Sequence, residues 1–215
     1  MEKIIHQIWI GEYEMLERDR VFCNQLKEMN TDYEYVFWNN NNLPKLPEKL
    51  ENLKNIFVST KNWVMLADML RLYVVYEYGG IYLDCDYEVF DSFSNRKLDE
   101  NDGFIHLNHW SNDPTICSSF FGFTKGHPML IHVYNQIANR WMGPHFFGEY
   151  IKDYLGLDIR VDFDDMIVHE KLKEMNIASN SSLQELREFA LHHGSATWLD
   201  ENKAKLKLDK NYKGI

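Results

Sequence analysis

The stretch of sequence that decides the fold is Tyr78-Gly79-Gly80-Ile81-Tyr82-Leu83-Asp84-Cys85-Asp86. It follows residues 62–78, in which apolar side chains recur every three or four positions, as they do in a helix with one buried face. Glycine readily adopts the positive φ with which many helices end, and the apolar residues after the two glycines are typical of a buried strand. We therefore expect a helix, a sharp turn and a short strand, with two aspartates directly after the strand.

Strands and helices are expected on both sides of this stretch as well. Residues 3–10 and 33–38 are rich in β-branched and aromatic side chains, and residues 14–29 between them have a helical pattern. Further along the chain we expect strands at 81–84, 87–90, 103–107 and 116–123, and helices at 128–141 and near 181–189. This alternation predicts an α/β fold. Because the sequence has no repeat and no linker, we expect one domain over residues 1–215, with a Lys-rich tail from about residue 200.

Composition and charge exclude several classes of protein. The chain has 215 residues, of which 45% are hydrophobic and 14% aromatic, so it can build a core and is not expected to be disordered. Its 23 Lys and Arg against 33 Asp and Glu give a net charge of −10, which argues against nucleic acid as a partner. No apolar run approaches the ~18–20 residues of a membrane span, and the N-terminus lacks the apolar core of a signal peptide. The 3 cysteines, without C-x-x-C spacing, exclude a disulfide scaffold and a zinc finger and favour a cytoplasmic protein.

The pair Asp84 and Asp86 is the centre of chemical interest. In an extended chain, side chains two residues apart point to the same face. Two ionised carboxylates so placed repel each other, and a divalent cation such as Mg²⁺ or Mn²⁺ is the simplest counter-charge. On spacing alone, a turn with two exposed acids is an equal alternative. A second copy of the pattern, Asp162-Phe163-Asp164, lies in a charged stretch and is expected to be a solvated face.

The residues around this pair resemble a known family. Asp68 to Arg71, followed by Tyr78 to Asp86, closely resembles the D-x-x-R…G-G-x-Y-x-D-x-D block of the DxD-containing sugar transferases. These comprise glycosyltransferase family 32, which includes the yeast initiating mannosyltransferase and bacterial capsule transferases, and the related large clostridial glucosylating toxins. Residues 5–11 are similar to the family's opening I-H-x-I-W-x-G strand. Residues 192–198 are similar to its C-terminal His…Ser-Trp, so the resemblance covers residues 3–198.

The resemblance implies a GT-A fold, which is a single α/β domain around a mixed sheet, and Mn²⁺ or Mg²⁺ as cofactor. It implies that Asp86 binds the metal directly and that Asp84 contacts the donor and a metal-bound water. By the same resemblance, Asp68 and Arg71 hold the donor sugar and its diphosphate. An ordinary intrahelical ion pair, worth about 0.2–0.5 kcal/mol, is the alternative for these two residues.

Further donor contacts are implied at both ends of the chain. Trp9 matches a residue that stacks on the nucleotide base, a role that suits a flat aromatic ring, although a Trp in the core is the alternative. The resemblance places the donor against six more positions, which are Ile8, Ile10, Asn39, Tyr82, Thr197 and Trp198.

The resemblance also implies that one histidine of the C-terminal motif reaches the metal. The alternation of side chains along a strand allows only one of His192 and His193 to face the site, and the sequence does not decide between them. We take His193 as the third metal ligand.

The implied reaction moves a sugar from a UDP or GDP donor to a hydroxyl of a glycan, lipid-linked or protein acceptor, with retention, in glycan or surface polysaccharide synthesis. Asp84, Asp86 and Arg71 are the expected catalytic residues, because a metal and an arginine stabilise the charge on the departing diphosphate. A nucleotide-sugar hydrolase or nucleotidyltransferase on the same fold and a catalytically silent sugar-binding module are the alternatives. Residues 203–213 could contact the inner face of an anionic membrane, with a solvated tail as the alternative.

Overall fold

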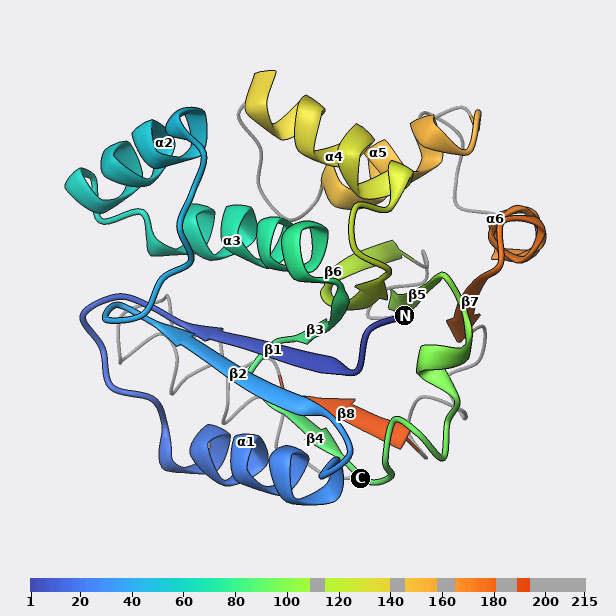
Figure 1. Ribbon diagram of the computed structural model, residues 1–215, viewed down its shortest axis with the longest axis horizontal. Helices are drawn as coiled ribbons and strands as arrows, with labels where there is room; N and C mark the ends of the chain where they lie inside the picture. Colours follow the sequence, from blue (N-terminus) through green and yellow to red (C-terminus); the bar gives the residue numbers. More distant parts are fainter. Residues whose placement is uncertain (109–114, 140–145, 158–164, 181–188, 194–215) are drawn as a thin grey trace.

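The computed structural model describes residues 1–108, 115–139, 146–157, 165–180 and 189–193 (Figure 1). Within them, six strands form a mixed central sheet in the order β2-β1-β3-β6-β5-β7. These strands are β1 (Ile4–Trp9), β2 (Glu34–Asn39), β3 (Gly80–Leu83), β5 (Gly103–Asn108), β6 (Thr115–Phe123) and β7 (Ile177–Asn180). Strand β1 runs parallel to β2 and β3, whereas β6 runs antiparallel to β3 and β5. The expected α/β fold with a mixed sheet is confirmed.

Helices cover both faces of this sheet (Figure 1). On one face lie α2 (Glu48–Ser59), α3 (Trp63–Tyr78), α4 (Pro128–Asn139) and α5 (Phe146–Tyr154). On the other face lies α1 (Glu17–Met29), together with a ribbon of the two short strands β4 (Tyr87–Val89) and β8 (Ala190–His192). Helix α6 (Asp165–Glu174) packs beside β7, and a 3₁₀ turn, η1, spans Leu98–Glu100. None of the helices in the described residues is long and apolar enough to cross a membrane.

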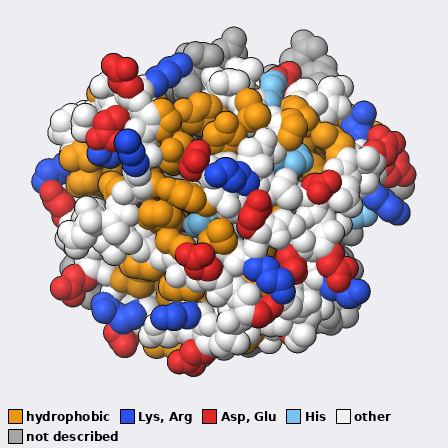
Figure 2. Space-filling view, viewed as in Figure 1, with side chains coloured by type: hydrophobic (Ala, Val, Ile, Leu, Met, Phe, Trp, Pro, Cys, Tyr) orange, Lys and Arg blue, Asp and Glu red, His pale blue; other side chains and the backbone are white. Residues whose placement is uncertain are grey.

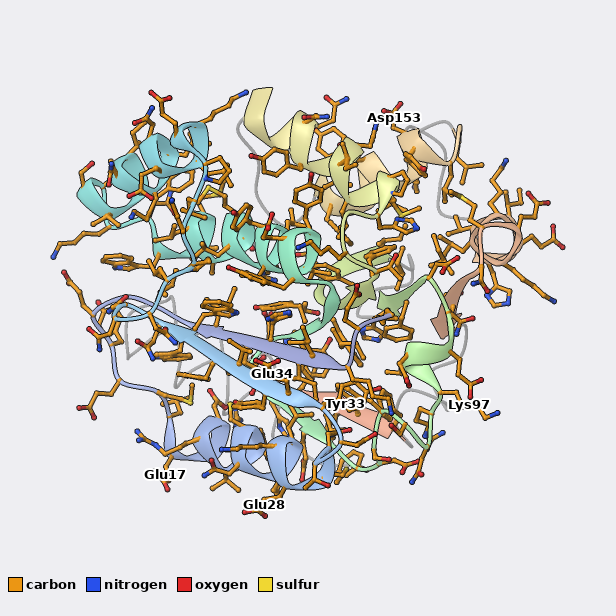
Figure 3. The ribbon with its side chains drawn as sticks, viewed as in Figure 1. Glu17, Glu28, Tyr33, Glu34, Lys97 and Asp153 are labelled. Atoms are coloured by element: carbon orange, nitrogen blue, oxygen red, sulfur yellow. The ribbon has the colours of Figure 1, made fainter. Side chains whose placement is uncertain are left out.

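The core has two parts because the sheet is buried on both faces. Successive residues of β3 alternate between them, so that Tyr82 packs under α3 while Ile81 and Leu83 pack toward α1 and β4. A strand covered on both sides is apolar at every position, which explains the run Ile81-Tyr82-Leu83. Figure 3 shows the amphipathic character of α1, whose Glu17 and Glu28 point away from the sheet. Figure 2 shows apolar side chains visible on the face that carries α2, α3 and β2.

The turn between α3 and β3 requires its two glycines. Gly79 has a φ of 74° and Gly80 a φ of 94°, a region that side-chain-bearing residues rarely adopt. A Cβ on Gly80 would lie 2.4 Å from the carbonyl oxygen of Ile4, so the start of β3 packs directly on the backbone of β1. This contact fixes β3 next to β1 and thereby places the two aspartates that follow.

Most of the elements expected from the sequence are present, and the differences have physical reasons. Helix α2 was not expected, because only Leu50 and Phe57 of it are buried and the apolar stripe is too thin to recognise. The helix expected at 14–29 begins at Glu17. The helix expected near 181–189 lies almost entirely outside the described residues, and so does Asp162-Phe163-Asp164.

Candidate functional site

The candidate site lies where the chain leaves β3. The N–H of Asp84 donates to the carbonyl of Ser119 on β6 at 2.8 Å, which holds the first aspartate against the sheet. The carbonyl of Asp86 accepts a bond of 3.0 Å from the N–H of His193, directly after β8. Two segments more than 100 residues apart in the sequence therefore meet here. One donor atom each from Asp84, Asp86 and His192 lies within 4.8 Å of the others, the spacing of a group that can hold a metal ion.

Asp84 is held by a tyrosine and faces an arginine. The hydroxyl of Tyr82 donates to Oδ1 of Asp84 at 2.5 Å, and Nη1 of Arg71 lies 3.3 Å from the same oxygen. Burial raises the pKa of the Asp84 carboxyl and the nearby Asp86 adds to the rise, while Arg71 opposes it. The net pKa is raised, so the ionised pair is unfavourable here and a bound cation would stabilise it.

His192 lies against the same pair of carboxylates. Its Nε2 lies 3.1 Å from Oδ1 of Asp86, and the two side chains are 16% and 13% exposed. Burial lowers the pKa of His192, but the carboxylates of Asp86 and Asp84 outweigh burial and leave it raised. A proton and a metal ion compete for the same nitrogen lone pair, so this histidine can exchange one for the other.

Arg71 is the centre of a buried set of charges on α3. Its Nη2 lies 3.0 Å from Oδ1 of Asp68, and its Nη1 donates to the carbonyl of Ser118 at 3.0 Å. The guanidinium also lies over the ring of Tyr82, 5.1 Å from its centroid. The Asp68 and Arg71 side chains are each only 10% exposed, so this is not a solvated surface pair. Burying charges is costly, and such groups frequently mark functional sites.

The residues expected at the nucleotide base lie at the carboxyl ends of β1 and β2. This is the same end of the sheet as Asp84, which follows β3. Trp9 and Asn39 end the parallel strands β1 and β2 and are paired in register. Trp9 is partly exposed and its indole N–H donates to the carbonyl of Tyr13 at 3.0 Å. The carboxyl ends of parallel strands are where ligands bind in open α/β sheets.

Other expected residues make contacts within the protein. Oδ1 of Asn39 accepts from the N–H of Asn41 at 2.9 Å. Ile8 is buried and its carbonyl accepts from the thiol of Cys85 at 3.5 Å, whereas Ile10 is partly exposed.

Two of the expected residues make their contacts elsewhere in the structure. We expected His193 at the metal, but its Nε2 lies 3.0 Å from Oε2 of Glu88 and its ring stacks on Phe22. The alternation of side chains along β8 turns His192, and not His193, toward the two aspartates. Tyr82 was expected to touch the donor, but it is 1% exposed and its hydroxyl is bound to Asp84. Thr197 and Trp198 lie outside the described residues.

Sequence reasoning missed Gln7, a side chain that supports the backbone of Asp84. Gln7 is fully buried in β1, where its amide donates to the carbonyl of Asp84 at 3.4 Å and accepts from the hydroxyl of Tyr35 at 2.6 Å. The signal was a polar residue in the otherwise apolar run Ile4–Trp9, because a buried amide needs hydrogen-bond partners.

Part of the chain is similar in sequence to known glycosyltransferases. A family model described as a glycosyltransferase sugar-binding region containing the DXD motif matches residues 17–104. Inositol phosphoceramide mannosyltransferase 3 of Schizosaccharomyces pombe is 28% identical over 158 residues, which cover 67% of this chain and 39% of that protein. An uncharacterised glycosyltransferase, L373, of Acanthamoeba polyphaga mimivirus is 32% identical over 90 residues, which cover 39% of this chain and 34% of that one. The chain thus spans less than half the length of these curated relatives.

The fold has solved counterparts. The structure titled PaToxG Glycosyltransferase superposes with a TM-score of 0.61 at 15% sequence identity and covers 98% of this chain and 85% of that one. The likeness at this identity concerns the fold, which is the GT-A fold expected from the sequence. Residues 17–104, which include Asp84 and Asp86, are thus similar to the sugar-binding region of the DXD-containing glycosyltransferases, and the chain has the GT-A fold.

Proposed function

We propose that this chain is a metal-dependent glycosyltransferase that moves a sugar from a nucleoside diphosphate to an acceptor hydroxyl. The observation that carries the proposal is the cluster of Asp84, Asp86 and His192, with donor atoms within 4.8 Å of one another and Arg71 beside it. A diphosphate carries negative charge, so it needs both a cation and a hydrogen-bond donor of this kind. A cluster of acids alone would not bind it.

The donor set fits a divalent cation. Carboxylate oxygens suit Mg²⁺ and Mn²⁺, and the imidazole nitrogen of His192 favours Mn²⁺ because Mg²⁺ strongly prefers oxygen. When bound, such a cation neutralises diphosphate charge and polarises the oxygen that leaves the sugar. Asp84, Asp86 and His192 would hold it.

Arg71 is proposed to bind the diphosphate. Its planar guanidinium can donate two parallel hydrogen bonds to phosphate oxygens, and it is held in place by Asp68 and by the carbonyl of Ser118. In a site with little water, this positive charge stabilises the departing diphosphate more than it would in solvent. The carboxylate of Asp68 then accepts hydrogen bonds from hydroxyls of the donor sugar, and Trp9 forms the surface on which the base stacks. Asn39 and the backbone of Ile8 and Ile10 border the base.

The donor is proposed to be a UDP-sugar or GDP-mannose and the acceptor a glycan, a lipid-linked glycan or a protein, with retention at the anomeric carbon. The mannosyltransferase relative makes mannose and an inositol phosphoceramide the first donor sugar and acceptor to try. We propose residues 1–215 as one catalytic domain. A cytoplasmic location is proposed because Cys23 and Cys85 are both free thiols.

The test is a panel of nucleotide sugars incubated with Mn²⁺, with and without acceptor, in which released diphosphate and transferred sugar are measured. Transfer to an acceptor that depends on the metal and is lost in Asp86→Ala supports the proposal. Free sugar formed equally without acceptor identifies a hydrolase instead. The absence of any turnover, and of any nucleotide-induced rise in melting temperature, identifies a silent module, because a ligand at ~100 Kd should add about 2.7 kcal/mol.

A further inference from the structure

The placement of His192 depends on a short strand. In the part of the chain that the structure describes, β8 is hydrogen-bonded into a sheet through β4 alone. The register pairs Tyr87 of β4 directly with His192 of β8. The position of the histidine therefore depends on what holds Tyr87.

Tyr87 forms a flat support for the imidazole. The two rings are parallel to within 3° and their centroids are 4.4 Å apart. Tyr87 is fully buried, so its ring cannot turn away without disturbing the core around it. An imidazole held face to face in this way keeps its plane, and with it the direction of Nε2 toward Asp86.

The tyrosine hydroxyl is anchored in the central sheet. It lies 2.8 Å from Oγ of Ser119 on β6 and 3.2 Å from Nδ1 of His106 on β5. The carbonyl of the same Ser119 accepts the N–H of Asp84. One residue of β6 thus holds the first aspartate through its backbone and the histidine through Tyr87, which fixes both sides of the cluster to the same strand.

We propose that Tyr87 is a positioning residue for the metal site, which holds His192 in the orientation that a divalent cation needs. This inference rests on the proposed function, because it takes His192 as a metal ligand. It adds a role for a side chain that touches neither metal nor substrate. Residues that orient metal ligands typically change metal affinity about 10–100-fold when they are removed.

The experiment is a calorimetric titration of the full chain with Mn²⁺ alone, without nucleotide. Tyr87→Leu, which removes the ring, is expected to weaken Mn²⁺ binding about 10–100-fold. Tyr87→Phe keeps the stacked ring and should recover a large part of this loss, while Ser119→Ala should resemble Tyr87→Phe. Should Tyr87→Leu fail to fold, these two milder variants still test the anchoring, because each should bind Mn²⁺ measurably more weakly than the parent.

The matched control is Phe93→Leu. Phe93 is fully buried in the same core cluster and also contacts Phe120, but no ring contact joins it to His192. Phe93→Leu should lower the melting temperature as Tyr87→Leu does, and should leave Mn²⁺ affinity unchanged. Equal weakening in both variants would mean that any core damage affects the metal, and would overturn the positioning role.

Two further variants separate this proposal from the proposed function. His192→Ala and Asp86→Ala should both lose Mn²⁺ binding. If they do while Tyr87→Leu, Tyr87→Phe and Ser119→Ala bind like the parent, the role of Tyr87 is wrong and the metal site stands. If His192→Ala and Asp86→Ala also bind like the parent, the metal site itself is wrong, and both proposals fall with it.

Discussion

The corner after β3 and the edge at the ends of β1 and β2 are built in opposite ways. At the corner, Arg71 is enclosed by Asp68, Asp84 and the carbonyl of Ser118, so charges are buried and face one another. At the edge, uncharged polar groups form hydrogen bonds with one another. The side chain of Asn40, for example, accepts a hydrogen bond from the N–H of Gly11 and donates one to its carbonyl.

The difference indicates what each region can bind. Charges held in a site with little water act strongly on a charged group such as a diphosphate. The partly exposed ring of Trp9 at the edge offers a flat apolar surface to a nucleotide base, but little charge. The corner is therefore expected to control rate and the edge to control affinity for the base. The following predictions test that division, starting from the largest effect.

Asp86→Ala should abolish metal-dependent turnover, because it removes an oxygen ligand from the cluster. We expect a loss of at least ~10²–10³ in the rate of diphosphate release, about 3–4 kcal/mol. The measurement is steady-state turnover over a range of Mn²⁺ concentrations. Trp9→Leu, at the edge, is the control and should retain most of kcat; a parental rate in Asp86→Ala would remove this residue from the site.

The strand that leads to the edge should contribute a pH-dependent stability through His6, which lies in the middle of β1. Nε2 of His6 bonds to the carbonyl of Gly79 at 2.8 Å, and its Nδ1 accepts from the indole N–H of Trp38 at 3.2 Å. Burial lowers the pKa of His6 from 6.5 to about 4, although the bond to Gly79 opposes this change. The neutral ring is thus favoured in the folded state, and its contribution is complete above pH 6.5.

As the pH falls from 6.5 to 4, this contribution should be lost, and the free energy of unfolding should fall by about 3 kcal/mol. Denaturant unfolding of the parent and of His6→Gln over this range measures the change. The parent should lose more stability than the variant, in which no imidazole titrates at this position. Parallel curves for the two proteins would contradict the assignment.

Arg71→Lys should reduce turnover about 10–100-fold, less than the loss of a complete hydrogen-bonding group, because lysine keeps the charge but not the planar pair of donors. The reduction should appear in kcat with little change in base affinity. Comparison with Arg71→Gln, which should be slower still, separates charge from geometry. Equal rates for the parent and Arg71→Lys would place Arg71 outside the mechanism.

Trp9→Leu should weaken binding of the nucleoside diphosphate by about 1–3 kcal/mol, the range of base–aromatic stacking. Trp9→Phe should restore part of the affinity because it keeps a ring. Binding measured by calorimetry in the presence of Mn²⁺ tests this, and unchanged affinity in Trp9→Leu would mean that the base lies elsewhere.

The sequence was most informative where structure is local. The stripe of α3, the two glycines and the short strand after them are consecutive, so the position of Asp84 and Asp86 at the end of β3 could be inferred from the residues alone. It could also be inferred that Asp68 and Arg71 share one face of the helix, because they are three residues apart, but their burial could not.

Contacts between distant segments could not be inferred in the same way. Whether His192 or His193 faces the aspartates depends on the register of β4 with β8, and the paired Tyr87 and His192 are more than 100 residues apart in the sequence. A strand as short as β8 has no alternating pattern that could fix its register. The hydrogen bonds that hold Asn39 and Tyr82 within the protein likewise arise only from the folded arrangement.

The central claim is that Asp84, Asp86 and His192 together bind a divalent cation that receives the diphosphate of a sugar nucleotide. Anomalous diffraction at the manganese edge, from crystals containing Mn²⁺ and a nucleoside diphosphate, tests it most directly. We predict one strong peak bonded to Asp86 and His192, with diphosphate density between it and Arg71. A manganese peak elsewhere, or none at these side chains while nucleotide is bound, would contradict the claim.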